Sequence, residues 1–360
     1  MATLKNTTID DTGFLQIPSG TTAQRPASPV IGDFRYNTEE ETFEVYDGED
    51  WVEIGTTSGL YAFTTATFSP GGATGRLGPS LTQARNGLSG PEANDWRNNT
   101  ELFNTTNGIQ LWTVPRDGTY RIETWGAQGG GGARGGLGAR MRGDFTLTQG
   151  DIIKILVGHQ GLTGPNQRSA GGGGVSAVWK PNPLTLLVAA GGGGGVTAGN
   201  LSSPPGLSNG QTTENGAAGQ SSPTWNNYPG GTAGNGGGAS RGAGGGGSGG
   251  GWLSNAENDT GSSGGFGRPN GWLGGNLRSS GSDRISGSFG GSGGASDGGT
   301  PNSFSGGGGG GGYSGGGAGV GDGGGSSGAG GGGGSFNSGT NPSNSAAVRV
   351  GDGQVTITLL

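Results

Sequence analysis

Side chains able to perform acid–base, nucleophilic or metal chemistry are scarce in this sequence. The 360 residues include one His, His159, and no Cys. One His without Cys builds neither a His-rich metal site nor a Cys–His dyad, so a structural hydrogen-bonding role is the better interpretation of His159. The adjacent carboxylates Asp10-Asp11 and Glu39-Glu40-Glu41 lie in predicted turns and are typical of solvated surface.

Glycine motifs for phosphate binding carry no weight in this composition. With 94 Gly residues, GxGxxG matches arise by chance, and none has the strand, helix and acidic residue that give the motif its meaning. No Lys follows a Gly in a Walker pattern. We therefore expect no catalytic residue, no cofactor and no metal site, and we predict that the chain is not an enzyme.

The composition limits the partners and divides the chain. Only 12% of residues are charged and the net charge is −6, so nucleic acid is not an expected partner. No window approaches the ~18 apolar residues of a membrane span, and the start MATLKNTTIDDTGF lacks the pattern of a secretory signal. Hydrophobic residues make up 28%, and 14 of the 94 glycines lie in residues 1–125 while 80 lie in residues 126–360. We place the main boundary near Trp125.

Residues 1–58 predict a small β meander. The stretch from Thr42 to Tyr46 alternates in polarity, Asp47-Gly48 forms a turn, and the alternation resumes from Trp51 to Ile54. This pattern indicates a hairpin. Phe34-Arg35-Tyr36-Asn37 supplies a third short strand, and a meander of this size is too small to stand alone, so we expect it to pack on copies of itself or on a partner.

The same segment resembles a module of bacteriophage tail-fibre and other virion structural proteins. The resemblance is carried by Ile17-Pro18-Ser19-Gly20-Thr21-Thr22-Ala23-Gln24-Arg25-Pro26, by Arg35-Tyr36-Asn37-Thr38 and by Trp51-Val52-Glu53-Ile54-Gly55. It implies a phage particle without indicating which part. Arg25 and Arg35 are predicted to be structural.

Strand patterns continue beyond Trp125 and return at the end of the chain. We predict strands at 119–125, 152–157, 175–179 and 184–190, with 152–157 central in its sheet because it is apolar on both faces except for Lys154. After Gly191 regular strands disappear until 347–350 and 355–360. Residues 191–345 are therefore expected to be an insertion whose ends are held together by a β domain.

The glycine runs allow three interpretations. Collagen is excluded because Gly does not recur at every third residue. A flexible Gly/Ser linker is the default for this composition. The third is a bundle of polyglycine II helices, in which chains without Cβ approach closely enough for inter-segment backbone hydrogen bonds. Aromatic residues at fairly even intervals, from Trp225 to Phe336, favour the ordered bundle.

A second resemblance covers roughly residues 110–200. The segments are Trp125-Gly126-Ala127-Gln128-Gly129-Gly130, Ile155-Leu156-Val157-Gly158-His159-Gln160-Gly161, Gly171-Gly172-Gly173-Gly174-Val175 and Leu187-Val188-Ala189-Ala190-Gly191-Gly192. They are similar to the glycine-rich domain of the anaplastic-lymphoma and leukocyte receptor kinases. The resemblance implies a jelly-roll-like β sandwich interleaved with polyglycine II helices. Because this chain has no Cys, hormone binding and signalling are not carried over.

These patterns predict a mainly β chain with little or no α-helix. Its expected parts are an N-terminal virion attachment or assembly module (1–58), a β-sandwich (59–190), a polyglycine II insertion (191–345) and closing strands of the sandwich (346–360).

The expected function is that of a non-enzymatic phage virion component of tail-fibre or adhesin type, made in the host cytoplasm and located in the virion. The alternative is a purely structural virion protein: a capsid fibre, decoration or tail-associated protein without receptor contact. Expected partners are other virion proteins, copies of the chain in a homo-oligomer such as a trimer, and a host surface glycan or outer-membrane protein. The candidate receptor contacts are Trp252, Trp272 and Phe289, with capping of the bundle as their alternative role.

Overall fold

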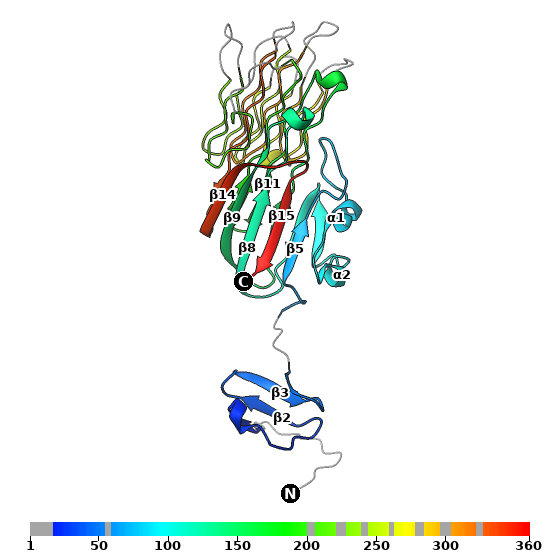
Figure 1. Cartoon of the computed structure of the whole chain (residues 1–360), viewed down its shortest axis with the longest axis vertical. Helices are drawn as coiled ribbons and strands as arrows, with labels where there is room; N and C mark the ends of the chain where they lie inside the picture. Colours follow the sequence, from blue (N-terminus) through cyan, green and yellow to red (C-terminus); the bar gives the residue numbers. More distant parts are fainter. Residues whose placement is uncertain are drawn as a thin grey trace. The chain divides into compact units, whose positions relative to one another are not determined.

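A computed structural model describes residues 17–54, 59–199, 206–220, 228–238, 244–258, 263–277, 284–295, 304–321 and 327–360. The chain divides into two compact units, Met1–Gly59 and Leu60–Leu360. Figure 1 shows the elements of each unit in sequence colours.

The N-terminal unit is a four-stranded sheet in the order β1-β2-β3-β4. Its hairpin and third strand confirm the prediction for this segment, because β2, β3 and β4 pair antiparallel in that order. The short β1, parallel to β2, has no periodic sequence signal and was not predicted. The elements are β1 (Ser19–Gly20), the 3₁₀ helix η1 (Thr22–Gln24), β2 (Phe34–Asn37), β3 (Thr42–Tyr46) and β4 (Trp51–Glu53).

The second unit contains two sheets that form a β sandwich. One has six strands in the order β13-β12-β11-β10-β7-β6, and the other has five in the order β14-β9-β8-β15-β5. The strands are β5 (Thr65–Phe68), β6 (Phe103–Thr106), β7 (Ile109–Thr113), β8 (Gly118–Trp125), β9 (Gly138–Leu147), β10 (Ile152–Leu156), β11 (Ser176–Pro181), β12 (Leu184–Ala190), β13 (Phe336–Asn337), β14 (Thr340–Arg349) and β15 (Gln354–Leu359).

The core between the sheets follows the alternation read from the sequence. Tyr120 and Ile122 of β8 are fully buried and pack in one cluster with Ile153 and Ile155 of β10. β10 lies between β11 and β7, which confirms its predicted central place. The closing strand β15 pairs with both β8 and β5, so the end of the chain returns to the middle of the sheet.

Helices are short and few among the described residues. The α-helices are α1 (Leu81–Gly87) and α2 (Ala93–Trp96), and the further 3₁₀ helices are η2 (Gly132–Arg134), η3 (Pro165–Gln167) and η4 (Arg268–Asn270). α1 begins with a capping box, in which Ser80 and Gln83 satisfy each other's backbone donors. The prediction of a mainly β chain with little helix is confirmed.

The glycine runs form an ordered bundle that extends from one end of the sandwich (Figure 1). Their segments exchange backbone hydrogen bonds over long sequence separations. Gly193 N donates to Ala127 O at 2.9 Å, Gly173 N to Gly193 O at 2.8 Å, and Gly311 N to Gly173 O at 3.0 Å. None of these glycines has a positive φ or lies in a helix, and Figure 1 draws their segments as extended traces, as a polyglycine II bundle requires.

The absence of Cβ atoms allows these segments to approach each other closely. A Cβ added at Gly172 would overlap the carbonyl oxygen of Gly309, and one at Gly310 would overlap that of Gly192. Because many backbone donors find an acceptor on another segment, the entropy lost by the glycines is offset by a cooperative array of hydrogen bonds.

The bundle includes more of the chain than the insertion predicted at 191–345. Segments 126–137 and 158–175 also belong to it, as continuations of β8 and β10 and as the approaches to β9 and β11. The chain re-enters the sandwich at β13, where Phe336 pairs with Ala189, and β14 begins at Thr340. The ends of the insertion are therefore neighbours in the six-stranded sheet.

Candidate functional site

The three aromatic residues expected to contact a receptor are buried. Trp252 is 8% exposed, Trp272 1% and Phe289 0%. This placement corrects the expectation that loops present them to a ligand, because stacking on a sugar needs an accessible ring face. Trp225, which begins the aromatic series, lies outside the described residues.

The aromatic residues instead pack the bundle onto the outer face of the six-stranded sheet. Trp252, Trp272 and Phe289 share a cluster with Trp179 of β11 and Leu156 of β10. The Trp179 and Trp252 rings meet edge to face, with centroids 5.8 Å apart and an interplanar angle of 81°. The second hydrophobic core of the unit therefore lies between sandwich and bundle, and the three aromatic residues belong to it.

Arg268 belongs to the same junction. Its guanidinium carbon lies 4.6 Å from the centroid of the Trp252 ring, and its Nε donates to the Trp252 carbonyl at 3.2 Å. Burial lowers the pKa of this guanidinium from its ordinary value. Arginine is in effect always protonated in proteins, so the side chain remains a cation at neutral pH.

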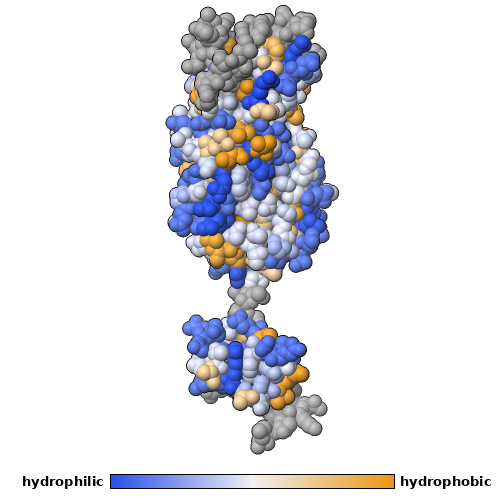
Figure 2. Space-filling model, viewed as in Figure 1, coloured by the Kyte–Doolittle hydropathy of each residue, from blue (hydrophilic) through white to orange (hydrophobic). Residues whose placement is uncertain are grey.

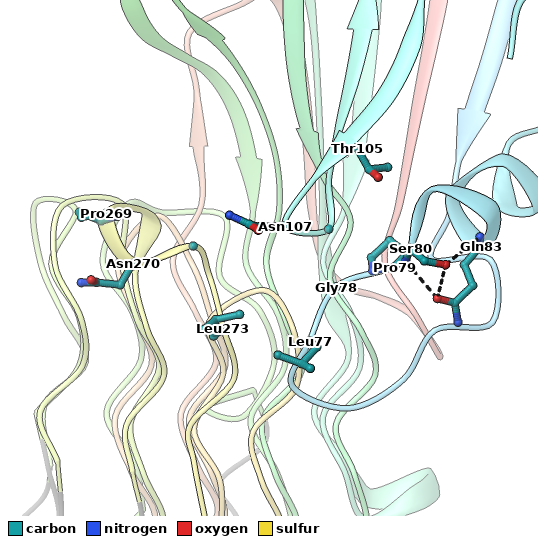
Figure 3. Close-up of a pocket in the computed structure, with 12 residues that line it drawn as sticks. Leu77, Gly78, Pro79, Ser80, Gln83, Thr105, Asn107, Pro269, Asn270 and Leu273 are labelled. Atoms are coloured by element: carbon teal, nitrogen blue, oxygen red, sulfur yellow. Dashed lines mark hydrogen bonds between the residues drawn. The ribbon is translucent and has the colours of Figure 1, made fainter. Parts of the chain in front are cut away.

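A groove opens at this junction, and Figure 3 shows its larger compartment, of about 850 Å³. Three elements line it: the loop that leads into α1, the β6–β7 hairpin and the turn at η4. Asn107 of the hairpin points toward the η4 turn, which carries Pro269 and Asn270 (Figure 3). The side chains of this compartment are neutral amides, hydroxyls and apolar groups, contributed by Leu77, Pro79, Ser80, Gln83, Thr105, Asn107, Pro269, Asn270 and Leu273.

A smaller compartment of about 430 Å³ adjoins the first and shares Asn107, Pro269 and Gly271 with it. It is lined by two cations, Lys154 and Arg268, and also by Thr106, Ile109, Trp179, Pro181, Leu184 and Trp272. None of the described lining residues of either compartment is acidic. The groove thus has a neutral part and a cationic part.

Two of the elements that line the groove, the loop before α1 and the β6–β7 hairpin, pack against Phe289 of the glycine-rich insertion. Phe289 lies under Gly78 and Gly108, where an added Cβ would collide with its ring or with the neighbouring backbone. Phe289 N also donates to Gly75 O at 2.8 Å, and Gly274 N donates to Arg76 O at 3.1 Å. These contacts join the loop before α1 to the glycine bundle, so the groove is formed by packed elements.

His159 is a buried structural residue. It is 0% exposed, and its Nδ1 lies 3.1 Å from Gly75 O. A carbonyl only accepts, so the neutral ring carries its proton on Nδ1, and Nε2 has no partner among the described residues. Burial lowers the pKa of His159. This environment favours the neutral ring.

The N-terminal unit has an ion-pair cluster at its centre. Glu44 is 2% exposed and accepts from Arg25 NH2 at 2.6 Å, while Arg35 NH1 lies 3.2 Å from its other oxygen. The hydrogen bond from Arg25 holds the pKa of Glu44 below its usual value. The prediction that Arg25 and Arg35 are structural agrees with these contacts. In residues 17–54 only Gly20, Arg35, Asn37 and Glu44 are fully buried.

A set of apolar side chains of this unit lies on the opposite face of its sheet from Glu44. The cross-strand register places Phe34 beside Val45, Val45 beside Val52, and Tyr36 beside Phe43. Phe34 is 40% exposed, Phe43 43% and Val52 39%, and the Phe34 and Phe43 rings are stacked. We call this set, with Ile54 at 41% exposed, the open apolar face. Figure 2 shows hydrophobic atoms at the surface of this unit.

The described part of the chain shows neither a metal-binding cluster nor a membrane-spanning helix. No group of three His, Cys, Asp or Glu side chains there could hold a metal ion. None of the helices there has the length and apolar character needed to cross a membrane.

Comparison with known proteins gives a partial likeness. No family model matches the chain. A stretch of 109 residues, 29% of the chain, is 36% identical to the leukocyte tyrosine kinase receptor of Mus musculus. The match covers 11% of that receptor, so the two proteins share a segment. Membership of a family is not shown, and both resemblances read from the sequence remain predictions.

Sequence reasoning missed the groove because its lining comes from segments far apart in the chain. Lys154 had one visible signal, as the single charged residue in an otherwise apolar central strand. Arg268-Pro269-Asn270-Gly271 had the composition of a turn, but its place beside β10 depends on the path of the glycine bundle.

Proposed function

We propose that the chain is a non-enzymatic phage virion component of the tail-fibre or adhesin type. The single observation that carries this proposal is the construction of the N-terminal unit. Its buried centre is polar, around Glu44, whereas Phe43 and the other side chains of the open apolar face are partly exposed. A folded unit with this inverted distribution is suited to assembly, and the virion-type motifs of residues 17–55 indicate the kind of assembly.

We infer that the open apolar face packs against copies of the same unit. The face carries no charged side chain, so identical copies are complementary to one another. The acidic residues of the strand connections, Glu39–Glu41 and Asp47 to Asp50, lie beyond the strand ends. A homo-oligomer such as a trimer covers these apolar groups, and other virion proteins then contact the assembled base.

The sandwich and glycine bundle form the part that binds a host surface glycan or outer-membrane protein in this proposal. The bundle is supported by inter-segment hydrogen bonds and by the Trp252–Trp179 contact, so its connecting loops can change without loss of the scaffold. Neither nucleic acid binding nor membrane insertion is part of the proposed role.

The proposal is tested on purified particles of the phage whose genome would encode this chain. Mass spectrometry of purified particles is expected to detect the chain, and labelling with antibodies against residues 60–360 is expected to mark a projecting structure. The purified full chain is expected to bind host cells in a saturable way. Absence of the chain from purified particles would overturn the virion assignment.

A purely structural virion role is the second candidate, and one observation favours it. Trp252, Trp272 and Phe289 all pack inside the molecule, so the aromatic residues of the bundle are accounted for by stability alone. A chain found in the particle without saturable binding to host cells or their envelope supports this role, as a capsid fibre, decoration or tail-associated protein.

A further inference from the structure

The cationic compartment of the groove contains donor groups without acceptors. Lys154 is half-buried on β10 and forms no ion pair with any described residue, unlike Lys180, which pairs with Asp151 at 2.8 Å. Arg268 uses Nε for the Trp252 carbonyl, and its terminal nitrogens have no hydrogen-bond partner in the described part of the chain. These positive groups line one pocket whose described lining residues include no carboxylate.

Trp272 also lines this pocket. It is 1% exposed, and its indole Nε1–H has no partner among the described residues. An unpaired buried donor costs free energy, and native proteins rarely retain one without a reason.

Backbone strain is found at the same place. Trp272 has φ +59°, a left-handed conformation that bulky residues avoid. Strained residues persist where the surrounding structure imposes them, and they cluster at binding sites. Trp272 lines the smaller compartment, so this strained residue lies at the groove.

The neutral compartment next to it presents a different chemistry. Gln83, whose side-chain oxygen accepts from Ser80, lines this compartment, and Thr105 and Asn107 add a hydroxyl and an amide. Leu77, Pro79 and Leu273 supply apolar surface between these groups. Neutral hydrogen-bonding groups interleaved with small apolar surfaces match the alternating hydroxyl and C–H faces of sugar rings.

We propose that this groove binds an acidic oligosaccharide, with a carboxylate of one sugar between Lys154 and Arg268 and the neighbouring sugars in the neutral compartment. The inference rests on the proposed function, because it names the ligand class of the host-facing part. The compartment volumes of about 850 and 430 Å³ lie within the range of small-molecule sites.

An acidic peptide is less suited to the same groove. It would place a charge at most positions, whereas cations line only the smaller compartment and the larger compartment is neutral. A sugar chain with intermittent carboxylates has the charge spacing that the groove presents.

The test measures binding of the purified full chain to a panel of acidic oligosaccharides by calorimetry. The probes contain galacturonate, glucuronate or sialate, and each is paired with its methyl ester as a neutral counterpart. Hexaglutamate serves as the peptide probe. The expected result is saturable binding of at least one acidic sugar, with the dissociation constant at least about tenfold higher for its ester, as loss of a charge-assisted contact implies.

Three variants locate the site. Lys154→Gln and Arg268→Gln are each expected to weaken sugar binding at least about tenfold. Lys180→Gln removes a cation on the neighbouring strand, outside the groove, and is expected to leave binding unchanged. Lys154→Gln leaves the Arg268–Trp252 contact intact, so a loss of sugar binding in this variant is not caused by loss of that contact. Equal thermal unfolding of the variants confirms that each is folded.

The inference is overturned if no acidic sugar binds, if Lys154→Gln and Lys180→Gln bind equally well, or if hexaglutamate binds as tightly as the best sugar. Its failure differs from failure of the proposed function. Normal host-cell binding by Lys154→Gln leaves the adhesin role in place and removes this site. If the chain binds an acidic sugar but does not bind host cells, the sugar site is supported and the adhesin role is overturned.

Discussion

The indole of Trp252 lies edge-on to the indole of Trp179, with ring centroids 5.8 Å apart. Trp179 belongs to strand β11 of the sandwich, and Trp252 belongs to the glycine-rich insertion. This contact shows how a sequence with almost no side chains in its runs is fixed to a conventional β domain. Side-chain packing joins the bundle to the sandwich, and backbone hydrogen bonds join the glycine segments to one another.

Adjacent glycines in the bundle are expected to differ sharply in their tolerance of a methyl group. Gly172→Ala places a Cβ against the carbonyl of Gly309, whereas the nearest atom to a Cβ at Gly171 is Ser286 O at 3.2 Å. Overpacking against backbone costs typically 1–3 kcal/mol, so Gly172→Ala is expected to lower the unfolding free energy by about 2 kcal/mol or more. Gly171→Ala, the matched control, is expected to change it by less than about 1 kcal/mol. Equal effects in denaturant titrations would contradict the tight packing.

The stability of the second unit is expected to fall in mild acid because of His159. Burial lowers its folded pKa, so below the unfolded value of about 6.5 the unfolded chain binds a proton that the folded chain resists. Stability is therefore full above pH 6.5 and decreases as the pH falls toward the lower folded pKa. His159→Gln is expected to flatten this part of the profile. The measurement is the unfolding free energy of both proteins from pH 7.5 to 5, and parallel profiles would show that His159 does not contribute.

Glu44 is expected to be essential to the N-terminal unit. Glu44→Gln leaves the buried Arg35 and its neighbour Arg25 without their carboxylate, and a hydrogen bond to a charged group contributes about 1.5–3 kcal/mol. We expect the unit to lose about 2–3 kcal/mol while the second unit unfolds as before. Glu53, directly opposite on β4 and exposed, gives the matched control Glu53→Gln, which relieves a like-charge pair. Equal unfolding of both variants, followed by near-UV circular dichroism, would rule out a central role for Glu44.

Self-association is expected to depend on the open apolar face and to strengthen with salt. The N-terminal unit contains eleven acidic residues and three basic ones, so copies repel one another until ions screen the charge. Sedimentation of the full chain is expected to show tighter association at about 0.5 M than at about 0.05 M NaCl, and Phe43→Ser is expected to weaken it at both. Val30→Ser, which removes an exposed side chain outside the strands, is the control. A monomer under all conditions contradicts the contact, and weakening by salt points to a basic partner instead.

Much of the β structure could be read from the sequence, because the strands alternate in burial. The strand predicted at 119–125 from its alternation is β8, and Asp47-Gly48 marked the turn of the N-terminal hairpin. The glycine bundle could be proposed but its extent could not. A glycine run has no side chains whose polarity could alternate. The local sequence therefore does not show that residues 126–137 belong to the bundle.

The candidate site was beyond sequence reasoning for a related reason. Trp252, Trp272 and Phe289 stood out as large side chains among glycines, and that prominence marks burial at a junction as readily as exposure on a loop. Lys154 and Arg268 line the same pocket because a strand of the sandwich lies beside a turn more than a hundred residues later in the chain. Only the folded path of the insertion brings these groups together.

Amide hydrogen exchange of residues 306–312 in the native full chain tests the ordered bundle most directly. Gly307 N donates to Gly328 O, Gly309 N to Gly247 O and Gly310 N to Gly331 O, all at 2.8–2.9 Å between separate segments. Strong protection of these amides, comparable with that of strand β10, is the predicted result. Exchange at the rate of an unstructured chain would contradict the bundle and return the glycine runs to the class of flexible linkers.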